Sequence, residues 1–340
     1  MKRVLITGSS GLVGSACVQF FTEKGWDVIG IDSDMRSYFF GTPAKYPENN
    51  IDIRDKVAIE ELFENHKFDA IIHAAAQPSH DWAKKEPLTD FDVNARGTLI
   101  LLEATRKFCP EAVFVHVSTD KVYGENMKCE VQEIETRYTH PTNVIEEVAD
   151  GLISQKGFSE YIGLDFAGRR SLFGVSKTAA DLYVQEYGNY FGMKTACFRC
   201  GCITGKQHEG AEYHGFLAYL VKCIKEGIVY RILGYKGKQV RDQIHALDLA
   251  NAFFHFIENP KVAVVYNMGG GEERSVSVLE AIKIIEKKTG NQALTEYVEE
   301  ERKGDRVFDI HDVSKFRKDY PEWDYKYSLD DIFNDLCGKE

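Results

Sequence analysis

The sequence has few of the features that set unusual proteins apart. No apolar run approaches the ~18 residues that a membrane span requires. We find no internal repeat, no low-complexity segment and no linker rich in proline or glycine. Basic residues are in the minority, since 42 Lys and Arg stand against 53 Asp and Glu and give a net charge of −11. This balance argues against a sequence-independent hold on nucleic acid, so an anionic ligand is expected to be held by a few placed arginines.

Cysteines are present but scattered, eight in a chain that is too long to need them as cross-links. With 340 residues, 44% of them hydrophobic, the chain can bury a large core, and its length favours two domains. We therefore expect reduced thiols and a cytoplasmic protein. Glycines 8, 11 and 14 interrupt the apolar stretch that follows Met1-Lys2-Arg3, which argues against a signal peptide.

Strand-like apolar runs alternate with helix-length amphipathic stretches over the first two hundred residues. This alternation predicts an α/β fold, a doubly wound parallel sheet with helices on both faces. Periodicity is weak from about 125 to 170, as in a long functional or mobile loop, and becomes mixed beyond about 200. We expect a first domain over 1–200 and a smaller α/β substrate domain over 201–340, with part of the chain returning to the first. The predicted strands are Val4–Thr7, Val28–Asp32, Ala70–Ala74, Val113–Ser118 and Thr195–Arg199, and the predicted helices are Val13–Lys24, Val57–Asn65, Gly97–Phe108, Val175–Phe191 and Ser277–Thr289.

A glycine-rich turn joins the first predicted strand to the first predicted helix, with the sequence Gly8-Ser9-Ser10-Gly11-Leu12-Val13-Gly14. Its glycines permit backbone N–H groups to approach a pyrophosphate, and the helix N-terminus adds free donors and a positive dipole. Asp32 ends the next predicted strand, where its carboxylate would accept a hydrogen bond from a ribose 2′-hydroxyl and repel a 2′-phosphate. The pattern predicts a Rossmann-type dinucleotide site that takes NAD rather than NADP.

The G-x-x-G-x-x-G spacing of this turn resembles the short-chain dehydrogenase/reductase superfamily, specifically its extended branch of NAD-dependent epimerases and dehydratases. Further matching stretches are Asp52-Ile53 after an expected third strand, His73-Ala74-Ala75-Ala76 after the fourth, Asn94, and Ser118–Gly124. The resemblance implies that Thr119 hydrogen-bonds the sugar hydroxyl that is oxidised. It implies cofactor contacts, besides those of the turn and Asp32, from Arg36, Asp52, Ile53, Ala74, Ala75, Asn94 and Lys177.

Within that branch the sequence is most similar to the 2-epimerases of CDP-tyvelose and CDP-paratose. Related 4,6-dehydratases carry an acidic pair after the threonine, where this chain has Asp120 and Lys121, so a glutamate for water elimination is missing. The resemblance implies a redox-neutral epimerisation, in which NAD takes a hydride from a sugar carbon and returns it to the other face. The similar stretches are Ser118–Gly124, Glu135–Tyr138, Leu164–Phe166, Gly237–Asp242 and Asp305–Phe308.

The expected catalytic pair departs from the family pattern at one residue. The family has a tyrosine and, four residues later, a lysine whose charge lowers the tyrosine pKa. Lys177 is present here, but Phe173 stands at the tyrosine position. Three explanations stay open: a deliberate Tyr→Phe substitution, a subfamily with another base, or a silent binding protein. The candidates for another base are Lys177 with a water, His80, Lys121, Cys200 and Cys202.

Substrate contacts are expected chiefly from arginines, because a nucleotide sugar carries a pyrophosphate that bidentate guanidinium groups clamp well. The resemblance places Arg241 and Arg302 at nucleotide-contacting positions, and Arg199 ends a strand that reaches the pocket. The whole set of expected substrate contacts is Gln77, His80, Asp120, Lys121, Arg199, Arg241, Arg302 and Asp305.

No metal site is expected, although Cys197 and Cys200 form a C-x-x-C. A structural zinc site needs a second ligand pair, and strand alternation would send these two thiols to opposite faces. Relatives dimerise through helices that correspond to Gly97–Phe108 and Val175–Phe191, so a homo-oligomer is expected. The favoured function is C2 epimerisation of a CDP-deoxyhexose, with no nucleic-acid or membrane partner. A 4-epimerase or 4,6-dehydratase, and a sensor of NAD or a nucleotide sugar, are the alternatives.

Overall fold

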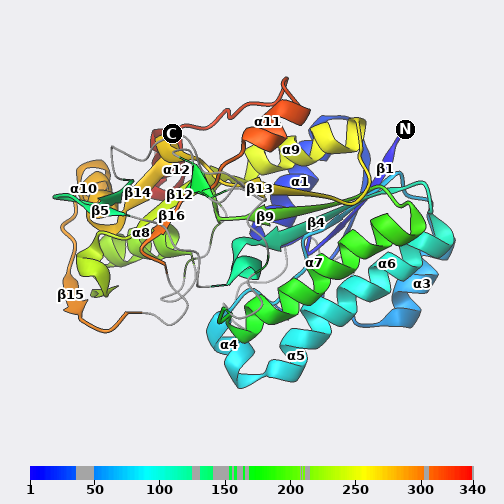
Figure 1. Cartoon of the computed structure of the whole chain (residues 1–340), viewed down its shortest axis with the longest axis horizontal. Coiled ribbons are helices and arrows are strands. Elements are labelled where there is room, and N and C mark those ends of the chain that lie inside the picture. Colours follow the sequence, from blue (N-terminus) through cyan, green and yellow to red (C-terminus); the bar gives the residue numbers. More distant parts are fainter. Residues whose placement is uncertain are drawn as a thin grey trace.

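A six-stranded sheet forms the centre of the larger region of the molecule (Figure 1). Its order is β13-β9-β4-β3-β1-β2, and all neighbouring strands are parallel. The predicted doubly wound parallel sheet is confirmed. The strands are β1 (Arg3–Thr7), β2 (Asp27–Ile31), β3 (Ala70–His73), β4 (Val113–Thr119), β9 (Thr195–Cys200) and β13 (Val264–Met268). This computed structural model describes residues 1–35, 50–124, 131–140, 153–154, 157–158, 164, 168–206, 208, 210, 215–301 and 306–338.

Helices cover both faces of this sheet. On one face α1 (Leu12–Glu23) packs against α9 (Ala246–Glu258). On the other, α6 (Gly97–Phe108) lies between α3 (Lys56–Asn65) and α7 (Leu172–Phe191). In the parts of the chain that the structure describes, no helix combines the length and apolarity needed to span a bilayer.

The predicted elements are present, with their ends shifted by a few residues. The largest shift is in α7, which begins at Leu172 rather than Val175 because Ser171 caps it by accepting a hydrogen bond from the Gly174 amide at 3.1 Å. The third strand expected before Asp52 is reduced, among the described residues, to one bridge between Asp32 and Asn50. Between β3 and α6 lie elements that periodicity did not predict: α4 (His80–Lys85), α5 (Pro87–Phe91) and a π-helical turn, η2 (Asp92–Arg96).

The smaller region is built mainly from the chain beyond residue 200. Three helices pack around an apolar cluster of their own: α8 (Phe216–Glu226), α10 (Val278–Thr289) and α12 (Leu329–Cys337). Strand β12 (Val240–His245) is the centre of a mixed sheet. Its neighbours are β10 (Cys202–Thr204), β14 (Ser275–Ser277) and β16 (Phe308–Asp309), and a separate parallel pair is formed by β11 (Tyr230–Leu233) and β15 (Thr295–Val298). The described chain also contains short elements in both regions, namely η3 (Asp120–Tyr123), β7 (Ile153–Ser154), β8 (Gly157–Phe158), η4 (Tyr235–Gly237), η5 (Glu272–Arg274) and α11 (Ser314–Asp319).

A hairpin from the weakly periodic stretch lies against the smaller region. It consists of β5 (Gln132–Glu133) and β6 (Tyr138–Thr139). Thr136 in its turn donates to a Glu280 carboxylate oxygen at 2.8 Å, and its carbonyl accepts from the Ser277 hydroxyl at 2.7 Å. Part of the insertion in the larger region is therefore anchored on the first turn of α10.

Phe198 on β9 is the centre of an aromatic cluster that joins the sheet to the helices behind it. Its ring is fully buried and lies 4.8 Å from Phe253, 5.9 Å from Phe256, 5.6 Å from Tyr266 and 5.7 Å from Phe316, measured between ring centroids. These partners come from α9, β13 and α11. The cluster ties β9 to segments that follow it by fifty residues or more.

We predict that Phe198→Ala lowers the free energy of unfolding by about 3–5 kcal/mol, because it removes a ring from a packed interior that cannot fully collapse. Urea unfolding followed by far-ultraviolet circular dichroism measures this loss. Leu294→Ala is the control, since Leu294 is 51% exposed and its truncation should change stability by no more than about 0.5 kcal/mol. An equal free energy of unfolding in the two variants would show that the aromatic cluster does not stabilise the fold as proposed.

Candidate active site

The glycine turn lies where the winding of the sheet reverses, between the carboxyl ends of β1 and β3. A Cβ on Gly14 would lie 1.9 Å from the Gly8 carbonyl oxygen, and one on Gly8 would lie 2.7 Å from the Ala75 amide nitrogen. Gly8 also has a φ of +70°, which disfavours any side chain. The turn is thus packed against the start of α1 and against the residues after β3, at the kind of edge where open α/β sheets bind ligands.

The N-terminus of α1 is free to receive an anion. Gly11 is its N-cap and offers no side-chain acceptor, so in the described part of the chain no N-cap side chain bonds the first N–H groups of the helix, those of Leu12, Val13 and Gly14. At the end of β2, the Asp32 carboxylate accepts hydrogen bonds from the Ser10 amide at 3.0 Å and the Asp34 amide at 2.9 Å. A pyrophosphate site and an acidic ribose site therefore share one edge of the sheet, as NAD requires.

The other expected cofactor residues are placed in different ways. Ala74 and Ala75 donate backbone N–H groups to the carbonyl and hydroxyl oxygens of Thr7 at 3.3 and 3.1 Å, which brings them beside the turn. Asp52 forms an ion pair with Arg54 at 2.5 Å, and Ile53 is buried in the apolar cluster beneath β2. Their contacts with adenine stay predictions. Arg36 lies outside the described residues.

A buried amide network, made of Gln77, Asp90, Asn94 and Ser176, holds the loop after β3 to α7. Asn94, in the π-helical turn, accepts from the Gln77 amide at 2.9 Å and donates to the Ser176 hydroxyl at 3.0 Å. The Gln77 side chain donates to Asp90 at 2.8 Å. Burial raises the pKa of Asp90, although hydrogen bonds from Ser176 and Gln77 oppose this shift. In this structure Asn94 and Gln77 serve to fix the backbone around the site.

Lys177 lies on α7 beneath the end of β4, and only 3% of its surface is exposed. Its ammonium donates to the Val117 carbonyl oxygen at 2.7 Å and lies 3.3 Å from Nε2 of His116. Burial lowers the pKa of Lys177 to about 8, and the nearby Asp181 limits the fall. The expected catalytic lysine is therefore held rigidly and close to its titration point.

His116 is a polar neighbour that the sequence analysis missed. It is fully buried, and its Nδ1 atom has no hydrogen-bond partner among the described residues. Burial and the charge of Lys177 keep its pKa well below the usual value, so it is neutral and Nε2 can accept from the lysine. A histidine in the middle of an otherwise apolar strand, Val113–Ser118, was the signal that could have revealed it.

Phe173 lies one turn before Lys177 on α7 and is 8% exposed. Its ring contacts the imidazole of His80, with 4.9 Å between ring centroids and an interplanar angle of 60°. His80 is the first residue of α4, whose N-cap Ser79 accepts a hydrogen bond from the Trp82 amide at 3.2 Å. The tyrosine position thus carries no hydroxyl but has an imidazole beside it.

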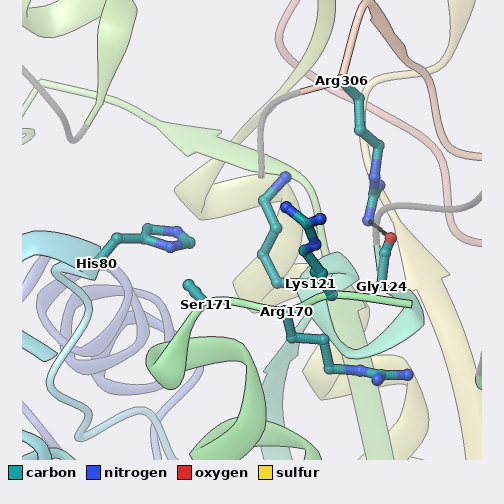
Figure 2. A pocket seen from close by; sticks show the side chains of 7 residues that line it. His80, Lys121, Gly124, Arg170, Ser171 and Arg306 are labelled. Carbon is teal, nitrogen blue, oxygen red and sulfur yellow. Dashed lines mark hydrogen bonds between the residues drawn. The ribbon is translucent and has the colours of Figure 1, made fainter. Parts of the chain in front are cut away.

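A cationic pocket opens next to this pair (Figure 2). His80 and Lys121 lie on opposite sides of it, and Arg306 reaches from the smaller region to donate to the Gly124 carbonyl oxygen at 3.1 Å. An excess of positive side chains suits an anionic ligand. The lining residues are His80, Lys121, Gly124, Arg169, Arg170, Ser171 and Arg306.

Asp120 ties the expected Thr119 to the smaller region. The Thr119 hydroxyl donates to the Asp120 carboxylate at 3.0 Å, and the same carboxylate pairs with Lys121 at 3.1 Å and Arg306 at 3.0 Å. Arg306 also pairs with Asp309 at 3.0 Å. Burial would raise the pKa of Asp309, but Arg306, Lys121 and Arg241 hold it well below its usual value. The guanidinium of Arg306 acts as the counter-ion of both carboxylates.

The expected arginine clamp is engaged by protein groups in this structure. Arg199 is 4% exposed and pairs twice with Asp181, at 2.7 and 3.1 Å. Arg241 is buried and donates to the carbonyl oxygens of Val240 and Arg306. Their contact with a substrate pyrophosphate stays a prediction. Arg302 and Asp305 lie outside the described residues.

The cysteines near the site are protonated thiols. Burial raises the pKa of Cys200 far above neutral pH and that of Cys202 to about 12. Cys197 packs in the cluster on the α7 side of the sheet and Cys200 in the cluster on the α9 side, so they face opposite ways. No disulfide joins any of the seven cysteines that the structure describes.

We predict that Gly14→Ala weakens NAD binding at least a hundredfold, because its Cβ would push the Gly8 carbonyl and distort the turn. Isothermal titration with NAD measures this effect. Gly25→Ala is the matched control, at the other end of α1: its Cβ meets no atom within 4 Å and only its φ of +76° is strained. The control should bind NAD normally, and equal weakening in both variants would contradict the prediction.

Lys177 should leave a pH signature in stability. Its pKa of about 8 lies below the usual 10.5, so the folded protein binds fewer protons than the unfolded chain between these values. Stability therefore rises with pH across this window, by up to about 1.4 kcal/mol per pH unit, relative to a variant without the group. We expect urea unfolding to show that the free energy of unfolding of the wild type increases from pH 8 to 10 relative to that of Lys177→Met. Parallel plots of this free energy against pH for the two proteins would disprove the titration.

Comparisons with known proteins agree with this geometry. The model of the NAD dependent epimerase/dehydratase family matches residues 4–269. The chain is 32% identical to CDP-paratose 2-epimerase from Salmonella typhi over 297 residues, 84% of this chain and 83% of that protein. It is 26% identical to dTDP-glucose 4,6-dehydratase from Escherichia coli over 96% of this chain and 86% of that one.

Solved structures show the same fold. UDP-glucose 4-epimerase from Thermotoga maritima, crystallised with UDP-glucose, superposes with a TM-score of 0.77 over 99% of this chain and 97% of that one, at 24% identity. The family match covers the glycine turn, Asp32, Lys177 and the last strand of the large sheet. The predicted family and its NAD cofactor are thus confirmed, and the chain belongs to the NAD-dependent epimerase/dehydratase family.

Proposed function

We propose that this protein is an NAD-dependent 2-epimerase of a CDP-activated deoxyhexose. The observation that carries the proposal is its 32% identity with a CDP-paratose 2-epimerase over 84% of the chain. Relatives that act at other positions, such as the 26% identical dTDP-glucose 4,6-dehydratase, match with lower identity over a similar length. C2 is therefore the sugar carbon at which we expect the reaction.

The cationic pocket supports a nucleotide-sugar substrate. The pocket lies next to the contact between His80 and Phe173, in a protein whose net charge is −11. Two of its cations, Lys121 and Arg306, are paired with Asp120 and Asp309. The excess of positive charge at the pocket therefore comes from Arg169 and Arg170. Such a local excess would draw in the anionic pyrophosphate of an NDP-sugar. In the proposal Arg241 and Arg302 hold the nucleotide from the smaller region, and the sugar points towards Thr119.

NAD, when bound, supplies hydride acceptance and return at the sugar carbon. The chain supplies the positions: the glycine turn and Asp32 hold the dinucleotide, and Lys177 presents its ammonium below the end of β4. Thr119 offers a hydroxyl to the sugar from the carboxyl end of the same strand. Because the hydride returns to the same carbon, the reaction needs no net oxidant, and the cofactor can stay in place.

Dehydration is less well supported by the charges near Thr119. Elimination of water needs a group that pulls or delivers protons at the neighbouring carbon. Lys121 stands where dehydratases carry a second acidic residue, and it pairs with Asp120 at 3.1 Å and Asp309 at 3.5 Å. Asp120 itself is held by Arg306 at 3.0 Å. No carboxylate near Thr119 in the described part of the chain is thus free of a cationic partner.

A homodimer is part of the proposal. Large apolar side chains along α7 are partly exposed, which suits a helix that packs on a second copy of the chain. The expected interface joins α6 and α7 of one copy to those of its partner. The exposed residues are Leu172, Val175, Leu182, Tyr183, Tyr190 and Phe191.

We predict that the protein interconverts CDP-paratose and CDP-tyvelose in deuterated water without a change in mass, because the hydride returns from the cofactor and no solvent proton reaches carbon. Mass spectrometry and NMR of the products measure this. Lys177→Met should lower kcat at least a hundredfold while the CDP-sugar still binds.

Several outcomes would contradict the proposal. Deuterium at the inverted carbon would indicate enolisation, a loss of water would indicate a dehydratase, and inversion of a UDP-hexose at C4 alone would indicate a 4-epimerase. Binding without conversion, both in the wild type and in Phe173→Tyr, would indicate a sensor.

A further inference from the structure

The reaction proposed above needs a group that accepts the hydroxyl proton of the sugar, and most candidates near Phe173 are already committed. Lys121 is an ammonium between two carboxylates, at 3.1 Å from Asp120 and 3.5 Å from Asp309. Burial keeps the thiols of Cys200 and Cys202 protonated by raising their pKa values. Neither an ammonium in a salt bridge nor a buried thiol is a ready proton acceptor at neutral pH.

Lys177 is also poorly suited to accept this proton. With a pKa of about 8 it is mainly an ammonium at neutral pH, and it has no lone pair in that form. Its ammonium is directed to the Val117 carbonyl oxygen and to His116, below the end of β4. The lysine can supply a positive charge to the site but lacks the phenol through which relatives use it.

His80 lies next to the position where relatives carry the catalytic tyrosine. Its imidazole contacts the Phe173 ring at a centroid distance of 4.9 Å and lines the cationic pocket opposite Lys121 (Figure 2). An imidazole can take and return a proton within the range of physiological pH, which a phenylalanine cannot. The contact therefore places an acid–base group directly against the side chain at the tyrosine position.

The buried amide network fixes both members of this contact. Gln77 carries the loop that ends in His80: its side chain donates to the Ser79 carbonyl oxygen at 2.9 Å and accepts from the Ser79 amide at 2.6 Å. On the other side, Asn94 donates to Ser176, whose hydroxyl donates to the Phe173 carbonyl oxygen at 3.0 Å. One set of buried hydrogen bonds thus sets the position of the imidazole relative to α7.

We infer that His80 is the acid–base residue of this chain, a role that rests on the proposed epimerase function. The imidazole accepts the sugar hydroxyl proton as the hydride of the same carbon leaves for NAD, so the carbinol becomes a ketone. When the hydride returns to the other face, the imidazolium gives its proton back to the oxygen. Atoms and electrons balance over the cycle, and Phe173 serves as the surface against which the imidazole is held.

The test compares four forms of the full-length protein loaded with NAD: wild type, His80→Gln, Phe173→Tyr, and the double variant. Reduction of bound NAD is followed at 340 nm in single turnovers with CDP-paratose, and with UDP-glucose and dTDP-glucose as further probes. His80→Gln should lower the rate constant of NAD reduction about a hundredfold or more, the usual contribution of a general base, and should change the sugar concentration that gives half the maximal rate by less than threefold. The double variant should regain at least a tenth of the wild-type rate, because a phenol beside Lys177 replaces the imidazole.

His66→Gln is the matched control, since His66 follows α3, away from the pocket, and its change should leave the rate unaltered. His80→Gln with a rate close to that of His66→Gln would overturn the inference, as would a wild type that is inert while Phe173→Tyr is active. If UDP-glucose or dTDP-glucose, and not CDP-paratose, reduces the bound NAD, only the proposed substrate fails and His80 is judged on that sugar. No reduction by either the wild type or Phe173→Tyr with any of the three sugars overturns both ideas.

Discussion

The guanidinium of Arg306 links the two regions of the molecule across the site. It bonds Asp120, next to the end of β4 in the large sheet, and Asp309 on β16 in the smaller region, both at 3.0 Å. All three side chains are less than a tenth exposed. Lys121 pairs with the same two carboxylates, at 3.1 and 3.5 Å. A buried carboxylate without its partner is strongly destabilising, so these two cations together hold the two regions against each other. Arg306 also lines the cationic pocket, so these ion pairs lie at the pocket itself.

The site is also ordered by hydrogen bonds that do not face a ligand. The buried amide network joins the loop after β3 to α7, and the Lys177–Val117 bond joins α7 to β4. The loop after β3, the end of β4 and helix α7 are therefore fixed relative to one another before any substrate binds. This kind of preorganisation lets a scaffold keep its cofactor while the residues that contact the sugar vary.

The sequence predicted those parts of the fold and site that depend on local pattern. The glycine turn, Asp32 and Lys177 each follow from spacing along one strand or helix, and the structure has them on the expected elements. Short elements such as α4 and the π-helical turn escaped, because one or two turns give no readable periodicity. Partners far apart in the chain escaped as well: Asp181 is eighteen residues from Arg199, and Asp120 is 186 residues from Arg306. Spacing alone does not reveal that such charges neutralise one another.

The return of the chain to the large sheet has a consequence for how the protein can be divided. Strand β13, residues Val264–Met268, pairs with the outer edge of β9. Helix α9 packs against α1 on one face of the sheet. A fragment that ended near residue 200 would keep the glycine turn and Lys177 but would leave β9 as a bare edge strand and lose four aromatic neighbours of Phe198. Exposed edges of that kind recruit other strands and aggregate. We therefore expect that the dinucleotide-binding half does not fold stably alone, and that an excision or fusion design must include residues 246–268 and α11.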